Sequence, residues 1–93
     1  MTRSLSPFTR LTLLISELRG HRLEDLIDVK KCDLAHHVAK LRAEFTGTPH
    51  QGAAGEVEQL AGVLLSRIRG GEPSAEEGRQ ELLTSCRRLK DLL

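Results

Sequence analysis

The chain has 93 residues, with 14 basic and 13 acidic side chains, two Phe and neither Trp nor Tyr. This near balance of charge excludes a whole-chain electrostatic field that would draw the protein to nucleic acid or to an anionic membrane. The core must consist of aliphatic side chains, above all the seventeen Leu, which favours packed helices over a sheet. We therefore expect an all-α fold and one domain, residues 1–93, with a single core.

The cysteines and the apolar runs indicate a soluble, cytoplasmic protein. Cys32 and Cys86 lie more than fifty residues apart and do not form the pattern of a disulfide framework, so a reducing compartment is expected. The apolar run 11–15 is too short for the core of a signal peptide, and no stretch reaches membrane-spanning length. The usage of Arg, Leu and Ala is typical of GC-rich bacterial genomes.

The first predicted helix spans residues 7–19. Ser6 can cap its free N–H groups, and Pro7 suits the first helical position, where a missing N–H costs nothing. Its apolar stripe recurs at spacings of three and four residues: Leu11, Leu14, Ile15 and Leu18. Gly20 is expected to take the left-handed conformation and turn the chain back, because the next apolar stripe lies on nearly the opposite face of a continued helix.

The second predicted helix, residues 22–45, is the longest and forms the spine of the domain. Its main stripe consists of Leu23, Ile27, Leu34, Val38, Leu41 and Phe45. If the chain did not break at Gly20, this helix would continue the first one and the bundle would have three helices. Residues 46–55 are rich in Gly and other small residues and are expected to form a mobile connection.

Two further helices are predicted, at residues 56–69 and 74–92. The third presents Val57, Leu60, Ala61, Leu64 and Ile68, and Val63 and Leu65 widen its apolar surface. Ser74 followed by Glu77 predicts a capping box at the start of the fourth. The stripe of that helix is Ala75, Leu82, Cys86, Leu89 and Leu93. Four helices with short connections predict an antiparallel bundle.

A thiol and an imidazole stand four residues apart on the second predicted helix. Cys32 and His36 therefore share a face and could approach one metal ion. The other possible ligands are Asp33, His37, His21 and His50. Zinc requires three or four ligands, and the chain has neither a CxxC pair nor an HExxH motif, so the sequence predicts no metal and no cofactor.

His37 followed three residues later by Lys40 resembles one element of histidine phosphotransfer domains, which are four-helix bundles. That resemblance implies an exposed His37. The family usually has a small residue directly after the Lys, so that a response regulator can approach, whereas Leu41 stands here and belongs to the core stripe. Phosphotransfer, like metal binding, is therefore a remote alternative.

The back of the second predicted helix carries small and weakly polar side chains: Val29, Cys32, His36, Ala39 and Ala43. Small side chains permit close approach of another helix, and a small domain gains burial by association. Surplus apolar residues outside the stripes extend this surface: Leu13, Val63, Leu65 and Leu83. We predict a small helical interaction module, such as an adaptor, regulator or small chaperone, that binds itself as a homo-oligomer or binds a helix of another protein.

A Leu-rich bundle of this size has little room for an oriented catalytic pocket, so we predict neither enzyme activity nor catalytic residues. The main alternative is a DNA-binding regulator with a helix-turn-helix around Gly20 or Gly70. It would use one of two basic runs, Lys30 with Lys31, or Arg87 with Arg88 and Lys90. Both runs are short and lie near acidic residues, and neither has an aromatic residue beside it in the sequence for base stacking, which favours the interpretation as a protein-binding module.

Overall fold

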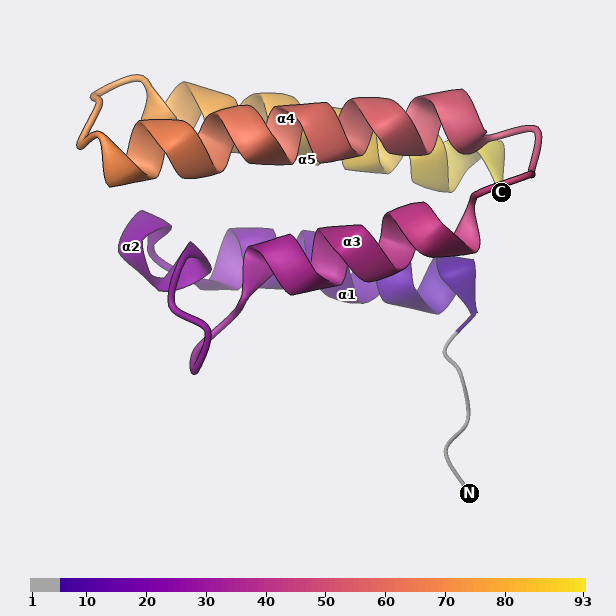
Figure 1. Cartoon of the computed structure of the whole chain (residues 1–93), viewed down its shortest axis with the longest axis horizontal. Coiled ribbons are helices and arrows are strands. Elements are labelled where there is room, and N and C mark those ends of the chain that lie inside the picture. Colours follow the sequence, from indigo (N-terminus) through magenta and orange to yellow (C-terminus); the bar gives the residue numbers. More distant parts are fainter. Residues whose placement is uncertain (1–5) are drawn as a thin grey trace.

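Five helices lie within residues 6–93, the part of the chain that the computed structural model describes (Figure 1). Their bounds are α1 Pro7–Gly20, α2 Leu23–Leu26, α3 Leu34–Glu44, α4 Gln51–Arg69 and α5 Ala75–Leu92. No strand occurs in this range. The prediction of an all-α fold is confirmed.

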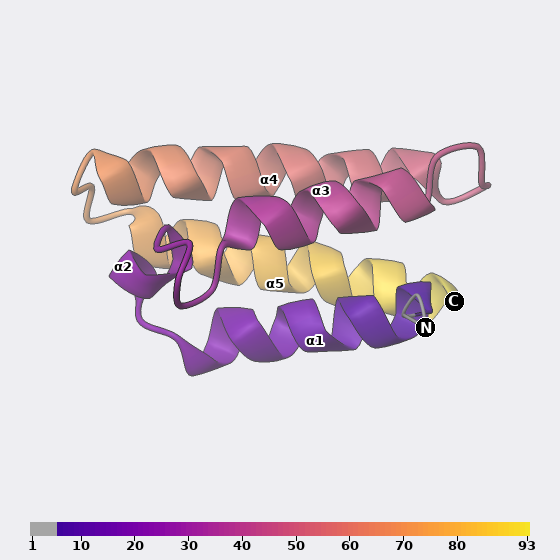
Figure 2. The same cartoon turned by 60° about the horizontal axis from the view of Figure 1, so that its bottom comes forward.

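The four long helices form an antiparallel bundle. Helix α1 packs on α3 and α5, and α4 packs on the same two helices. Successive long helices run in opposite directions (Figures 1 and 2). The single turn of α2 lies at the end of the bundle where α1 ends and α3 begins. The predicted bundle is therefore confirmed, with α2 as an additional short helix that the sequence analysis did not predict.

Leucine dominates the core, to which every helix contributes. The fully buried large side chains are Leu11, Leu14, Leu18, Leu26, Leu34, Leu41, Val57, Leu64, Leu82, Cys86 and Leu89. Most members of the predicted stripes belong to this set or pack against it. Leu93 is an exception, because it follows the last helical residue and is 48% exposed.

The beginning of α1 follows the prediction, but its end does not. The Ser6 side chain accepts the N–H of Thr9 at 3.1 Å, and Pro7 occupies the first turn. Gly20 remains the last residue of the helix and does not take a left-handed conformation. The chain turns instead because His21 and Arg22 both adopt extended backbone angles.

The prediction of one continuous helix over residues 22–45 is wrong. Helix α2 ends at Leu26, and α3 begins only at Leu34. In between, the Asp28 carbonyl oxygen accepts the N–H groups of the residues three, four and five positions later, at 3.0 to 3.1 Å. The Asp28 carboxylate also accepts the N–H of Lys30 at 2.9 Å. Asp33 then takes a left-handed conformation, with φ of 50°, which Asp tolerates better than most residues.

The break has a physical reason that is visible in the predicted stripe. Between Ile27 and Leu34, the positions that continue the helical spacing are Lys30 and Lys31, both of which are exposed. A continuous helix would have to bury one of these charges, which is costly. The separate turn of α2 avoids this and buries Leu26 completely.

Helix α4 begins five residues earlier than predicted. It starts at Gln51, so only residues 45–50 connect it to α3. The Gln51 side chain accepts the N–H of Gly47 at 2.9 Å, and Ala54 is buried in the core. The small residues of this segment therefore belong to the helix, although Gly is a poor helix former.

The turn between α4 and α5 is defined by Gly71. This residue has φ of 66°, a left-handed angle that glycine adopts at little cost. The N–H of Gly71 donates to Ile68 O and that of Glu72 donates to Arg67 O, as in a Schellman motif. The capping box predicted for Ser74 is wrong. The backbone of Ser74 has ψ of 0° and its side chain makes no capping bond, because that bond needs an extended capping residue.

Among residues 6–93, none of the helices combines the length and the apolar content that crossing a bilayer requires.

The burial of Leu26 gives a test of α2. Replacing Leu26 with Ala should lower the free energy of unfolding by about 2–5 kcal/mol, because a filled position in the core becomes a cavity. Replacing the exposed Leu92 with Ala removes the same atoms from the surface and should change it by less than about 0.5 kcal/mol. Urea unfolding followed by circular dichroism measures both. Equal effects of the two substitutions would contradict the position of α2.

Candidate functional site

The structure brings together only part of the predicted partner-binding seam. His36, Ala39 and Ala43 lie on one exposed face of α3. Val29 and Cys32 precede α3, so the helix face that was predicted to join all five residues does not form. Val29 is 71% exposed in the turn, whereas Cys32 is buried.

The surplus apolar residues divide into two groups. Leu13 on α1 and Val63 on α4 are exposed, by 45% and 43%. Leu65 and Leu83 are buried in the core rather than exposed, although Leu65 also lines the groove between α3 and α4 that is described next. Each long helix packs on two neighbours, and an apolar residue beside the main stripe therefore faces the second neighbour rather than solvent.

A shallow apolar groove runs between α3 and α4, beside the exposed alanines. It has a volume of about 180 Å³ and is lined by small and aliphatic side chains, namely Ala35, Val38, Ala39, Ala61, Gly62 and Leu65. Glu58 borders it and lies 3.8 Å from the Arg42 guanidinium, in an ion pair that joins the two helices. We refer to this feature as the α3–α4 groove. Its small residues leave a hollow that neither helix fills.

A cluster of possible metal ligands lies at the C-terminal end of α1. Glu17 and His21 are one helical turn apart, with His21 Nε2 2.6 Å from Glu17 Oε2. Residues 27–33, which we call the Asp28 turn, bring Cys32 next to these two side chains. The three possible ligand atoms lie within 4.8 Å of one another. Cys32 is thus paired with His21, which the sequence analysis considered as a ligand, and not with His36. The contribution of Glu17 was missed because it depends on the turn between α1 and α3.

Both thiols are protonated at neutral pH. Burial, together with the negative charge of the nearby Glu17 carboxylate, raises the pKa of Cys32 from 9.0 to about 11. Burial alone raises the pKa of Cys86 to about 12. Cys86 therefore behaves as the small core residue that the sequence predicted. Since the thiolate is the reactive form, neither cysteine is an activated nucleophile.

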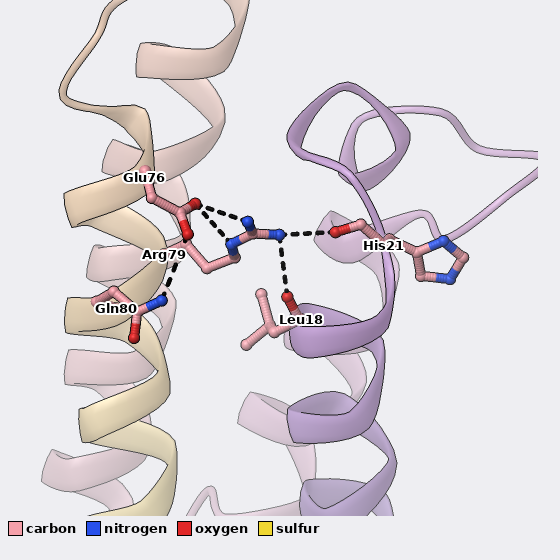
Figure 3. A network of polar contacts seen from close by, with 5 residues as sticks. All are labelled: Leu18, His21, Glu76, Arg79 and Gln80. Atoms are coloured by element: carbon pink, nitrogen blue, oxygen red, sulfur yellow. Dashed lines mark hydrogen bonds and ion pairs between the residues drawn. The ribbon is translucent and has the colours of Figure 1, made fainter.

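Arg79 of α5 fixes the end of α1 that carries the cluster (Figure 3). Its guanidinium donates to His21 O at 2.6 Å and to Leu18 O at 3.4 Å, two carbonyl groups near the C-terminus of α1. Glu76 accepts from the other side of the same guanidinium at 2.7 and 2.8 Å. A cation at this position also complements the negative end of the helix dipole. The side chain of His21 points away from this network (Figure 3).

The described residues do not form the geometry of a helix-turn-helix at either predicted turn. Helix α2, which follows Gly20, has only four residues. Helices α4 and α5, which flank Gly70, run antiparallel along each other (Figure 1), whereas the motif crosses its helices at about 90–120°. His37, from the phosphotransfer resemblance, is half-buried on α3.

Comparison with known proteins gives no match: no family model, no curated protein and no solved structure is similar to this chain.

Removing the Arg79 guanidinium should destabilise the bundle. Arg79→Met keeps most of the aliphatic stem but leaves the carbonyl groups of Leu18 and His21 without this donor, and we expect a loss of about 2 kcal/mol in the free energy of unfolding. Arg88→Met is the matched control, because Arg88 is exposed on the same helix and should change that free energy by less than about 0.5 kcal/mol. An equal effect of both variants in urea unfolding would contradict the capping role.

The raised pKa of Cys32 predicts how its alkylation depends on pH. In a Cys86→Ala variant, the rate of modification by iodoacetamide should rise about tenfold per pH unit up to about pH 10, because the thiolate fraction grows until the pH reaches the pKa. Mass spectrometry of quenched samples gives the rate. A plateau near pH 9, the ordinary pKa of a thiol, would show that the environment of Cys32 is not as described.

Proposed function

We propose that this chain is a protein-interaction module that associates with a second copy of itself through the α3–α4 groove. It acts by binding and not by catalysis. The observation that supports this function is the apolar groove of about 180 Å³ that α3 lines with Ala35 and Ala39 and that α4 lines with Ala61 and Gly62. A second helical surface can approach such a face closely and fill the hollow.

Gly62 supplies a separate argument. It stands in the middle of α4, where Gly lowers stability by about 0.5–1 kcal/mol relative to Ala. A Cβ atom added to Gly62 would meet no atom within 4 Å, so packing within one copy does not require a glycine there. A glycine at this position would let the backbone of a second copy approach the groove closely.

The charges near the groove favour a second copy as the partner. Lys40 lies on the exposed side of α3, and Glu58 of α4 borders the groove; both side chains are exposed. In a contact about a two-fold axis parallel to the helices, α3 of each copy lies against α4 of the other. Lys40 of one copy can then approach Glu58 of the other, and the symmetry repeats this contact, so opposite charges meet twice in a symmetric dimer.

Light scattering of the purified protein tests the proposal. The wild-type chain should have twice the mass of the 10.3 kDa monomer. Ala39→Arg places a charged, bulky side chain in the groove and should give a folded monomer. Ser16→Arg makes the same change at an exposed position of α1, outside the groove, and should remain dimeric. A wild-type monomer at every concentration, or equal effects of the two substitutions, would contradict the proposal.

Gly62→Ala separates association from folding. The free energy of unfolding of the variant monomer should exceed that of the wild-type monomer by up to about 1 kcal/mol. The dissociation constant of its dimer should nevertheless rise about tenfold, because the added methyl group occupies the groove. Gly52→Ala is the control, since Gly52 also has open space in α4 but lies outside the groove. Unfolding in urea and sedimentation velocity measure the two effects. A gain in stability without weaker association would contradict the role of Gly62.

A further inference from the structure

We propose that Glu17, His21 and Cys32 form a binding site for one zinc ion at the junction of α1 and the Asp28 turn. The three side chains offer a carboxylate oxygen, an imidazole nitrogen and a thiol sulfur, the donor types that zinc binds in proteins. Their ligand atoms lie within 4.8 Å of one another. The site is independent of the proposed dimer, because none of the three residues lines the α3–α4 groove.

The geometry requires only small movements to hold the ion. Tetrahedral zinc with bonds of about 2.1 Å keeps its ligand atoms roughly 3.4 Å apart. Glu17 Oε2 and His21 Nε2, now 2.6 Å apart, would separate slightly, and the sulfur would move closer. The Glu17 and His21 side chains are one-third and three-tenths exposed, so rotation about their terminal bonds is open to both, and an ion can enter from solvent.

The charge and softness of the ligands select zinc over the hard divalent cations. Magnesium and calcium prefer sites made only of oxygen, whereas thiolate and imidazole favour zinc. On binding, the Cys32 thiol releases its proton to solvent, and the carboxylate and thiolate together neutralise the two positive charges of the ion. Water completes the fourth position, as in zinc sites with three protein ligands.

The surroundings hold all three ligands before the ion arrives. Glu17 lies in the last turn of α1 and His21 directly follows the helix, and Arg79 binds the nearby carbonyl groups of Leu18 and His21. Cys32 is positioned by its own N–H group, which donates to Asp28 O at 3.0 Å. The ion would therefore add a cross-link between the turn before α3 and the end of α1, where Cys32 forms no disulfide.

Cobalt(II) is the probe for this site, because a cobalt–thiolate bond gives a charge-transfer band in the near ultraviolet. The reduced, metal-free chain should develop the band with one equivalent of Co²⁺, and Zn²⁺ should abolish it by displacement. Cys32→Ala should lose the band, and His21→Gln and Glu17→Gln should weaken binding at least tenfold. Cys86→Ala and His36→Gln are matched controls that should bind as the wild type does.

The outcomes separate this site from accidental binding. Three results would each overturn the proposal. The band could be absent in the folded wild type, Cys32→Ala could bind as the wild type does, or His36→Gln could lose as much affinity as His21→Gln. Zn²⁺ should also raise the urea midpoint of the wild type but not that of Cys32→Ala, because an ion bound only to the folded state stabilises it. Repeating the titration on the Ala39→Arg variant distinguishes a failed zinc site from a failed dimer, since that variant should bind zinc normally.

Discussion

The reversal of the chain between α1 and α3 is the constraint on which the rest of the structure depends. It is maintained from two sides. The Arg79 guanidinium donates hydrogen bonds to carbonyl groups at the end of α1. The Asp28 carbonyl oxygen accepts hydrogen bonds from three N–H groups of the following turn. With the reversal in place, α1 and α3 lie side by side and bury Leu18 and Leu34 in one core. Each long helix then has two packing neighbours, which a chain of this size needs in order to bury enough apolar surface.

The same reversal determines which surfaces are available for binding. It removes Cys32 from the face of α3 and places it beside Glu17 and His21. It also places the small residues Ala35 and Ala39 on the side of α3 next to α4, where the α3–α4 groove opens. The proposed zinc site at one end of the bundle and the proposed dimer contact along its side therefore both follow from one local turn, although they share no residue.

Much of the fold could be predicted from apolar spacing and from the residues at helix ends. Ser6 and Pro7 were sufficient to predict where α1 begins, and the glycines after α4 were sufficient to predict where α4 ends. Their effect on the backbone is local. The error over residues 22–45 arose because Leu23, Ile27 and Leu34 fit a helical spacing that skips the lysines at 30 and 31. Two aspartates in that gap, at positions 28 and 33, were a further signal, since Asp competes with the helix for backbone N–H groups. The cluster around Cys32 could not be predicted, because Glu17 and Cys32 meet only through the tertiary turn.

The backbone conformation of residues 27–33 is the most direct test of this account, and NMR chemical shifts with proton contacts measure it. We expect helical shifts to stop after Leu26 and to resume at Leu34, together with contacts between the side chains of Cys32 and His21. Uninterrupted helical shifts from Leu23 to Glu44, with no contact between those two side chains, would contradict the described reversal and both of the binding surfaces that depend on it.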